Sequence, residues 1–72
     1  MKSYYIDCRE LTEKQVGEVC KELERLGYLK TFDFGTPILI VAHSDGSYWI
    51  NCYYRFPNKH ETPITIEELK AL

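Results

Sequence analysis

The chain has 72 residues, of which 44% are hydrophobic, and it carries nine Lys and Arg against eleven Asp and Glu, for a net charge of −2. A domain of this size has little room for an enclosed active site, because a ligand pocket of about 300 Å³ would take up much of its core. The slightly acidic balance argues against a general nucleic-acid binder, which normally carries a basic patch. We therefore expect one domain, residues 1–72, that recognises a partner at its surface.

No targeting segment or membrane span is visible in the sequence. The first residues contain no apolar run, and the longest such run in the chain, Ile38 to Ala42, is too short to cross a bilayer. Cys8, Cys20 and Cys52 are odd in number and include no C-x-x-C pair, which favours reduced thiols over a disulfide framework. We expect a cytoplasmic protein whose three cysteines are small buried apolar residues.

The first half of the chain predicts a strand followed by a helix. Residues 3–8 alternate in the way that is typical of a strand with one buried face. Thr12 and Gln15 form a capping-box signature, and apolar residues then recur at helical spacing until Gly27, where a left-handed C-cap is expected. Gly17 lies inside this helix, where it costs about 1 kcal/mol relative to Ala. It either marks a close approach by another element or is simply tolerated.

The middle of the chain predicts a second strand at 30–34 and then a β-hairpin. The hairpin turn is Asp45-Gly46, which lies between an apolar run and an aromatic run. Asp-Gly supplies the positive-φ positions that a tight hairpin turn needs. The outgoing strand is expected to extend from Tyr48 to Phe56.

The end of the chain predicts an exposed loop and a short helix. Residues 57–63 have loop composition and are bounded by prolines, and Thr65 with Glu68 forms a second capping box. The element order is then β-α-β-β-β-α. It predicts an α+β fold: a small three- to four-stranded, mostly antiparallel sheet, with one helix packed on one face and a short C-terminal helix. The other face of the sheet is expected to be uncovered.

The outgoing hairpin strand carries the candidate binding surface. Alternation places one set of side chains under the helix: Tyr48, Ile50, Cys52, Tyr54 and Phe56. The other set would face solvent, and Trp, Tyr and Arg are the residues most enriched at binding hot spots. The candidate partner-binding residues are this second set and two residues of the neighbouring loop: Trp49, Asn51, Tyr53, Arg55, Lys59 and His60. The opposite register, with Trp49 in the core, is the alternative.

No motif for catalysis, a metal or a cofactor is found. Cys and His are suitable zinc ligands, but their spacings match no zinc-binding pattern. His43, Ser44 and Asp45 have the composition of a catalytic triad, yet adjacent residues on a turn do not converge on one substrate atom. Turn chemistry accounts for Asp45. We therefore expect a non-enzymatic protein with no catalytic residues, no metal and no cofactor.

Three other functions stay open. Trp49 and Tyr53 could stack a nucleotide or second messenger while Arg55 clamps its phosphate, although direct nucleic-acid binding is not expected beside charge that is not basic. The chain could form a homodimer through a sheet edge or through the open face, with its function elsewhere. The glutamates on the polar side of the helix could imitate a run of phosphates, although Lys14, Lys21 and Arg25 interrupt them.

Three segments carry a resemblance to a known class of proteins: Leu26-Gly27-Tyr28, the Asp45-Gly46 hairpin, and Ile64-Thr65-Ile66-Glu67-Glu68-Leu69. In these segments the chain resembles the very short accessory proteins of tailed bacteriophages and prophages. The resemblance implies a small protein that binds a bacterial host protein or protein complex in the host cytoplasm, for example as an anti-CRISPR or other anti-defence inhibitor. It implies no particular target and no particular functional residue.

Overall fold

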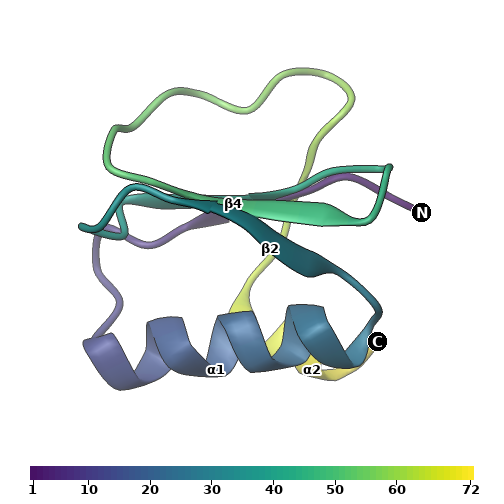
Figure 1. The fold of residues 1–72 in the computed structure, drawn as a ribbon, viewed down its shortest axis with the longest axis horizontal. Coiled ribbons are helices and arrows are strands. Elements are labelled where there is room, and N and C mark those ends of the chain that lie inside the picture. The colour runs from purple at the N-terminus through teal and green to yellow at the C-terminus, as the bar shows by residue number, and fades with distance from the viewer.

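A computed structural model of the chain shows a five-stranded sheet with two helices on one side (Figure 1). The elements are β1 (Tyr4–Asp7), α1 (Glu13–Arg25), β2 (Leu29–Asp33), β3 (Leu39–Ala42), β4 (Ser47–Asn51), β5 (Thr62–Pro63) and α2 (Ile66–Lys70). The predicted α+β class is confirmed. The predicted order of elements is also found, with the two-residue β5 added inside the segment that was expected to be a loop.

The strand order in the sheet is β2-β4-β3-β1-β5. The pairs β1–β3 and β3–β4 are antiparallel, whereas β1–β5 and β2–β4 are parallel. The sheet thus has five strands rather than the predicted three to four, and it is mixed rather than mostly antiparallel. The cause is α1, which carries the chain back along the sheet so that β2 runs in the same direction as β1 and enters beside β4.

The helix ends follow the sequence signals. Thr12 Oγ1 accepts the Gln15 N–H at 3.2 Å, and Gln15 Oε1 accepts the Thr12 N–H at 2.8 Å, so the predicted capping box is formed. Thr65 and Glu68 repeat this arrangement at α2. Gly27 has a φ of 99° and follows the end of α1, as predicted. Caps of this kind are local, which is why spacing alone predicts them.

The hairpin β3–β4 is confirmed, but its outgoing strand is shorter than predicted. In the turn only Gly46 has a positive φ, of 89°, while Asp45 accepts the Ser47 N–H at 2.9 Å. The prediction that β4 continues to Phe56 is wrong, since the strand ends at Asn51. β3 begins at Leu39, opposite Asn51, and β2 ends at Asp33, opposite Ile50, so a longer β4 would have no strand to pair with. The chain instead turns up over the sheet (Figure 1).

The main core lies between the sheet and the helices. The strands β1, β3 and β4 contribute Tyr4, Ile6, Ile40, Ala42, Tyr48 and Ile50, and the helices contribute Val16, Val19, Leu23, Ile66 and Leu69. Cys8 and Tyr28, from the connections beside α1, complete the core. Tyr48 and Ile50 therefore lie under the helix, as predicted. The same prediction is wrong for Tyr54, which packs on the opposite face of the sheet, and for Phe56, which is exposed. No helix of the chain has both the length and the apolar character that a membrane crossing requires.

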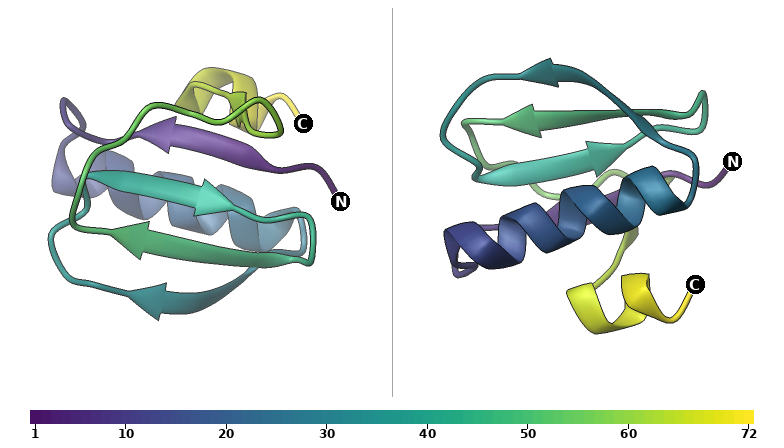
Figure 2. Two further views of the ribbon diagram at one scale, coloured as in Figure 1. Left: turned by 90° about the horizontal axis from the view of Figure 1, so that it is seen from above. Right: turned by 60° about the horizontal axis from the view of Figure 1, so that its bottom comes forward.

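The sheet face away from α1, called the far face below, is not wholly uncovered, contrary to the prediction. Residues 52–61 cross it above β3 and β1, as the left view of Figure 2 shows, and Tyr54 packs on Tyr5, Leu39 and Val41. Only the part above β4 and β2 stays accessible. Cys52 begins this crossing segment and is exposed, so the prediction that it is buried is wrong, whereas Cys8 is buried and Cys20 half-buried.

Candidate binding surface

Four ring side chains form a continuous row on the far face, which we call the aromatic row: His43, Trp49, Phe32 and Phe34. The ring centroids of His43 and Trp49 are 4.9 Å apart, and those of Trp49 and Phe32 are 4.7 Å apart in an edge-to-face arrangement. Phe34 stacks on Phe32 at 5.9 Å. Sheet register produces the row, because Phe32 is paired with Trp49 across β2 and β4.

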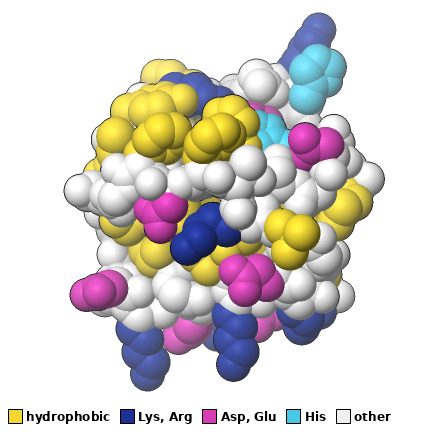
Figure 3. Space-filling model, in the orientation of Figure 1, with side chains coloured by type: hydrophobic (Ala, Val, Ile, Leu, Met, Phe, Trp, Pro, Cys, Tyr) yellow, Lys and Arg dark blue, Asp and Glu magenta, His cyan; other side chains and the backbone are white.

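The outer end of the row is exposed. Phe32 is 46% and Phe34 is 53% accessible, although both belong to or adjoin a strand of the sheet. Leu29, at the start of β2, is exposed as well. Figure 3 shows hydrophobic side chains gathered over this side of the molecule, above β2. A contiguous aromatic patch of this kind on a small domain is characteristic of an interaction site.

One ring nitrogen of each inner ring is buried in the protein. Trp49 Nε1 and His43 Nε2 are both buried and have no hydrogen-bond partner. Because the indole N–H is inside, the accessible part of Trp49 is carbon. The aromatic row therefore presents apolar ring surface to a partner, with little polar character of its own.

The crossing segment is held in place by an ion pair between the partly exposed Arg55 and the buried Glu61. Arg55 Nη1 and Nη2 donate to the two carboxylate oxygens of Glu61, each at 2.7 Å, and the Asn58 N–H donates to the same carboxylate at 3.1 Å. The Arg55 guanidinium holds the pKa of Glu61 below its usual value of 4.5. The pair raises the pKa of Arg55 in turn.

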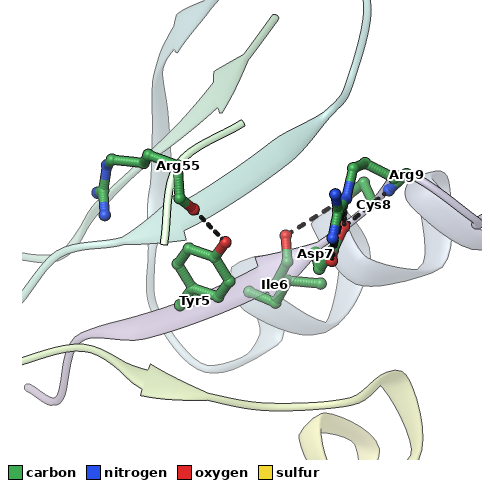
Figure 4. A network of polar contacts seen from close by, with 6 residues as sticks. All are labelled: Tyr5, Ile6, Asp7, Cys8, Arg9 and Arg55. Atoms are coloured by element: carbon green, nitrogen blue, oxygen red, sulfur yellow. Dashed lines mark hydrogen bonds and ion pairs between the residues drawn. The ribbon is translucent and has the colours of Figure 1, made fainter. Parts of the chain in front are cut away.

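Further contacts fasten the segment to β1. Figure 4 shows the Tyr5 hydroxyl donating to the main-chain carbonyl of Arg55, and Arg9 held by Asp7, with an Nη2···Oδ2 distance of 2.8 Å. The Arg9 guanidinium lies over the Tyr54 ring, 3.5 Å from its centroid. Burial, together with the neighbouring Tyr54, raises the pKa of Tyr5 to about 12. These contacts explain why the segment covers β1 and β3 and leaves the aromatic row free.

The six sequence-predicted residues do not form one surface. Trp49 and Asn51 share the far face as predicted, but Asn51 is only 3% exposed. Tyr53 is exposed beyond the end of β4, and Arg55 is occupied by Glu61. The last two, Lys59 and His60, are exposed in the crossing segment.

Phe32 and Phe34 were missed as site residues. The sequence did contain a signal, since the two rings stand two residues apart in the predicted strand 30–34 and so share a face. What it could not show was the position of that strand beside β4, which brings both rings next to Trp49.

A groove elsewhere on the surface is separate from the predicted site residues. A groove of about 620 Å³ lies at the opposite edge of the sheet, where β1, β5 and α2 meet, and Ile6, Leu11 and Ile64 line it. None of the predicted site residues borders it. No three His, Cys, Asp or Glu side chains lie together in a way that could hold a metal ion.

Comparison with known proteins identifies no relative. No protein-family model matches the chain, and neither the curated proteins nor the solved structures include a significant match. The functional argument therefore depends on the geometry of the molecule itself.

Proposed function

We propose that this chain is a non-enzymatic protein-binding module whose contact surface is the aromatic row. One observation carries the proposal: Phe32 and Phe34 are about half exposed, Phe34 stacks on Phe32, and Phe32 meets Trp49 edge to face, on a sheet face that is otherwise covered. Tyr53 adds an exposed ring beyond the end of β4. Aromatic side chains dominate binding hot spots because they combine large contact area with few rotatable bonds.

The size of the surface suits one partner protein. A standard interface buries about 800 Å² on each partner, which is about a sixth of the 4633 Å² surface of this chain. Complete burial of the exposed halves of Phe32 and Phe34 would remove about 150–250 Å² of apolar area from water. At about 25 cal/mol per Å² this contributes about 4–6 kcal/mol before the costs of association. The row is thus large enough to act as the centre of an interface.

The partner that we propose is a bacterial protein. The support is the resemblance of the chain to short accessory proteins of phages and prophages, a class that includes anti-CRISPR and other anti-defence inhibitors. Such a small module would act by occluding a surface of the host protein. Trp49 and Tyr53 remain the predicted residues that fit this role best.

The test compares matched aromatic truncations. The wild type, a Phe32→Ala/Phe34→Ala variant and a Phe56→Ala control are used for affinity capture from bacterial lysate, and binding of the captured protein is then measured by calorimetry. Phe56 is the control because it is also an exposed Phe but lies outside the row. We expect the double variant alone to lose the partner while its circular dichroism stays unchanged. Equal binding by all three proteins, or capture of no protein, would overturn the proposal.

A further inference from the structure

The outer edge of β2 has no neighbour. β2 is the terminal strand of the sheet and pairs only with β4, and all five of its residues are exposed. In the left view of Figure 2 no other segment lies beyond it. An edge strand of this kind presents a row of unpaired N–H and C=O groups, which another extended chain can satisfy. The aromatic row borders this edge through Phe32 and Phe34.

The backbone direction at this edge follows from one hydrogen bond. The Phe34 N–H donates to the Ile50 carbonyl at 3.0 Å, so the polar groups of Phe34 point towards β4. Successive residues of a strand direct their N–H and C=O groups to opposite edges. The N–H and C=O of Asp33 therefore point outward, where no strand receives them.

The side chains at the edge divide between the two faces. Phe32 is paired with Trp49 and lies on the far face, whereas Asp33 is paired with Ile50 and lies on the face that carries α1. The Asp33 side chain is 43% exposed and lies 3.5 Å from the ammonium group of Lys30. An ion pair this long and this exposed contributes little, so a basic group from another chain can compete for the carboxylate.

We infer that the partner contacts β2 as an extended segment paired antiparallel to Phe32–Phe34, with a basic residue opposite Asp33 and apolar residues on either side of it. This inference rests on the proposed function and specifies the chemistry of the partner. Residues directly opposite in an antiparallel pair have their side chains on the same face. The basic side chain would then meet the Asp33 carboxylate, and the two apolar side chains would cover Phe32 and Phe34.

A second copy of this chain fits the edge poorly. Two copies of β2 related by a two-fold axis through the regular part of the strand would place Asp33 opposite Asp33, and like charges directly opposite destabilise a strand pair. An axis shifted towards the start of β2 would meet the bulge between Lys30 and Phe32, where the pairing register is broken. A different chain with a basic residue at this position avoids both problems.

The experiment uses the whole protein and short synthetic peptides. The probe is acetyl-Thr-Val-Arg-Val-Thr-amide, and binding is followed by the fluorescence of Trp49 and by the amide NMR signals of β2. A peptide with Glu in place of Arg tests the attraction between the peptide's basic residue and Asp33. The Asp33→Lys variant tests the same attraction by reversing the charge on the protein. We expect the Arg peptide to bind the wild type about tenfold more tightly than the Glu peptide, and we expect Asp33→Lys to reverse this preference.

Peptides that are N-methylated at a single amide test whether binding depends on backbone hydrogen bonds or only on side-chain contacts. Methylating the Arg amide removes the donor that faces the Asp33 carbonyl, whereas methylating the following Val amide alters a group that points away from β2. We expect about tenfold weaker binding for the first peptide and little change for the second.

Three results would overturn the inference: no binding of the Arg peptide, equal effects of the two methyl groups, or self-association of the wild type that Asp33→Lys alters. None of these results bears on whether the Phe32→Ala/Phe34→Ala variant loses a partner protein. The inference and the proposed function can therefore fail separately.

Discussion

The guanidinium of Arg55 and the carboxylate of Glu61 form a bidentate ion pair, with both N···O distances at 2.7 Å. The Glu61 side chain is 5% exposed, so this carboxylate is charged in a largely dry environment that only its partners make tolerable. The main-chain carbonyl of Arg55 also accepts the Tyr5 hydroxyl. The pair thereby fastens residues 52–61 to β1 and decides which part of the far face is covered.

Replacement of Glu61 by Gln should destabilise the fold by about 2 kcal/mol, because hydrogen bonds to charged groups are lost and Arg55 keeps an unbalanced charge. Chemical denaturation of both proteins measures the difference. The control is Glu18→Gln, which removes an ion pair to Lys70 whose side chains are 34% and 50% exposed, and it should change stability little. Equal effects of the two substitutions would show that burial of Glu61 gives the Arg55–Glu61 pair no special role.

A fall in pH should lower the stability of the wild type more than that of the Glu61→Gln variant. The Arg55 guanidinium lowers the pKa of Glu61 in the folded protein below 4.5, its ordinary value. The Glu61 carboxylate therefore binds a proton more readily in the unfolded chain than in the folded protein. Its contribution to the free energy of unfolding is complete above about pH 4.5 and is lost as the pH falls through the lower pKa of the folded state. Denaturation curves below pH 4.5 measure this. Other carboxylates with lowered pKa, such as Asp7 and Glu18, are present in both proteins, so parallel acid profiles would contradict the prediction.

The local features of this fold are those that spacing in the sequence could predict. The Thr12–Gln15 and Thr65–Glu68 capping boxes and the left-handed Gly27 each depend on residues that lie within a few positions of one another. The alternation of Trp49 with Ile50 likewise predicted that their side chains lie on opposite faces of β4, although it left open which of the two faces the core. Such features form from interactions between neighbouring residues, so they do not depend on how the distant segments of the chain pack.

The remaining features depend on contacts between distant segments. β2 lies beside β4 rather than β3 because α1 sets its direction, and no property of residues 29–33 contains that information. The end of β4 at Asn51 depends on where its neighbours stop, and the Tyr5–Arg55 contact joins residues 50 positions apart. For these reasons the sequence placed Arg55 on the same strand face as Trp49, whereas in the structure Arg55 pairs with Glu61 and the ring of Phe32 contacts Trp49.

Gly17→Ala should stabilise the protein by about 1 kcal/mol. Apart from its chain neighbours and the backbone of its own helix, a methyl group at Gly17 would have no heavy atom within 4 Å. The close approach considered from the sequence is therefore absent, and the helix gains the propensity of Ala. Thermal denaturation measures the gain.

The matched control for that change is Gly46→Ala. Gly46 has a φ of 89°, and a methyl group there would lie 3.2 Å from the Met1 sulfur, so this variant should be less stable than the wild type. A loss of stability in both variants would mean that the middle of α1 is packed against something that the structure does not show.

One of the three thiols should react much faster than the others with Ellman's reagent. Cys52 is exposed at the start of the crossing segment, whereas burial raises the pKa of Cys8 to about 12 and also raises that of Cys20. Since the thiolate is the reactive form, Cys8 and Cys20 are protected both by burial and by protonation. Cys52→Ser should abolish the fast phase, and Cys20→Ser should leave it intact. A β4 that continued beneath α1 would protect Cys52 as well, so the absence of a fast phase in the folded wild type would contradict the end of this strand at Asn51.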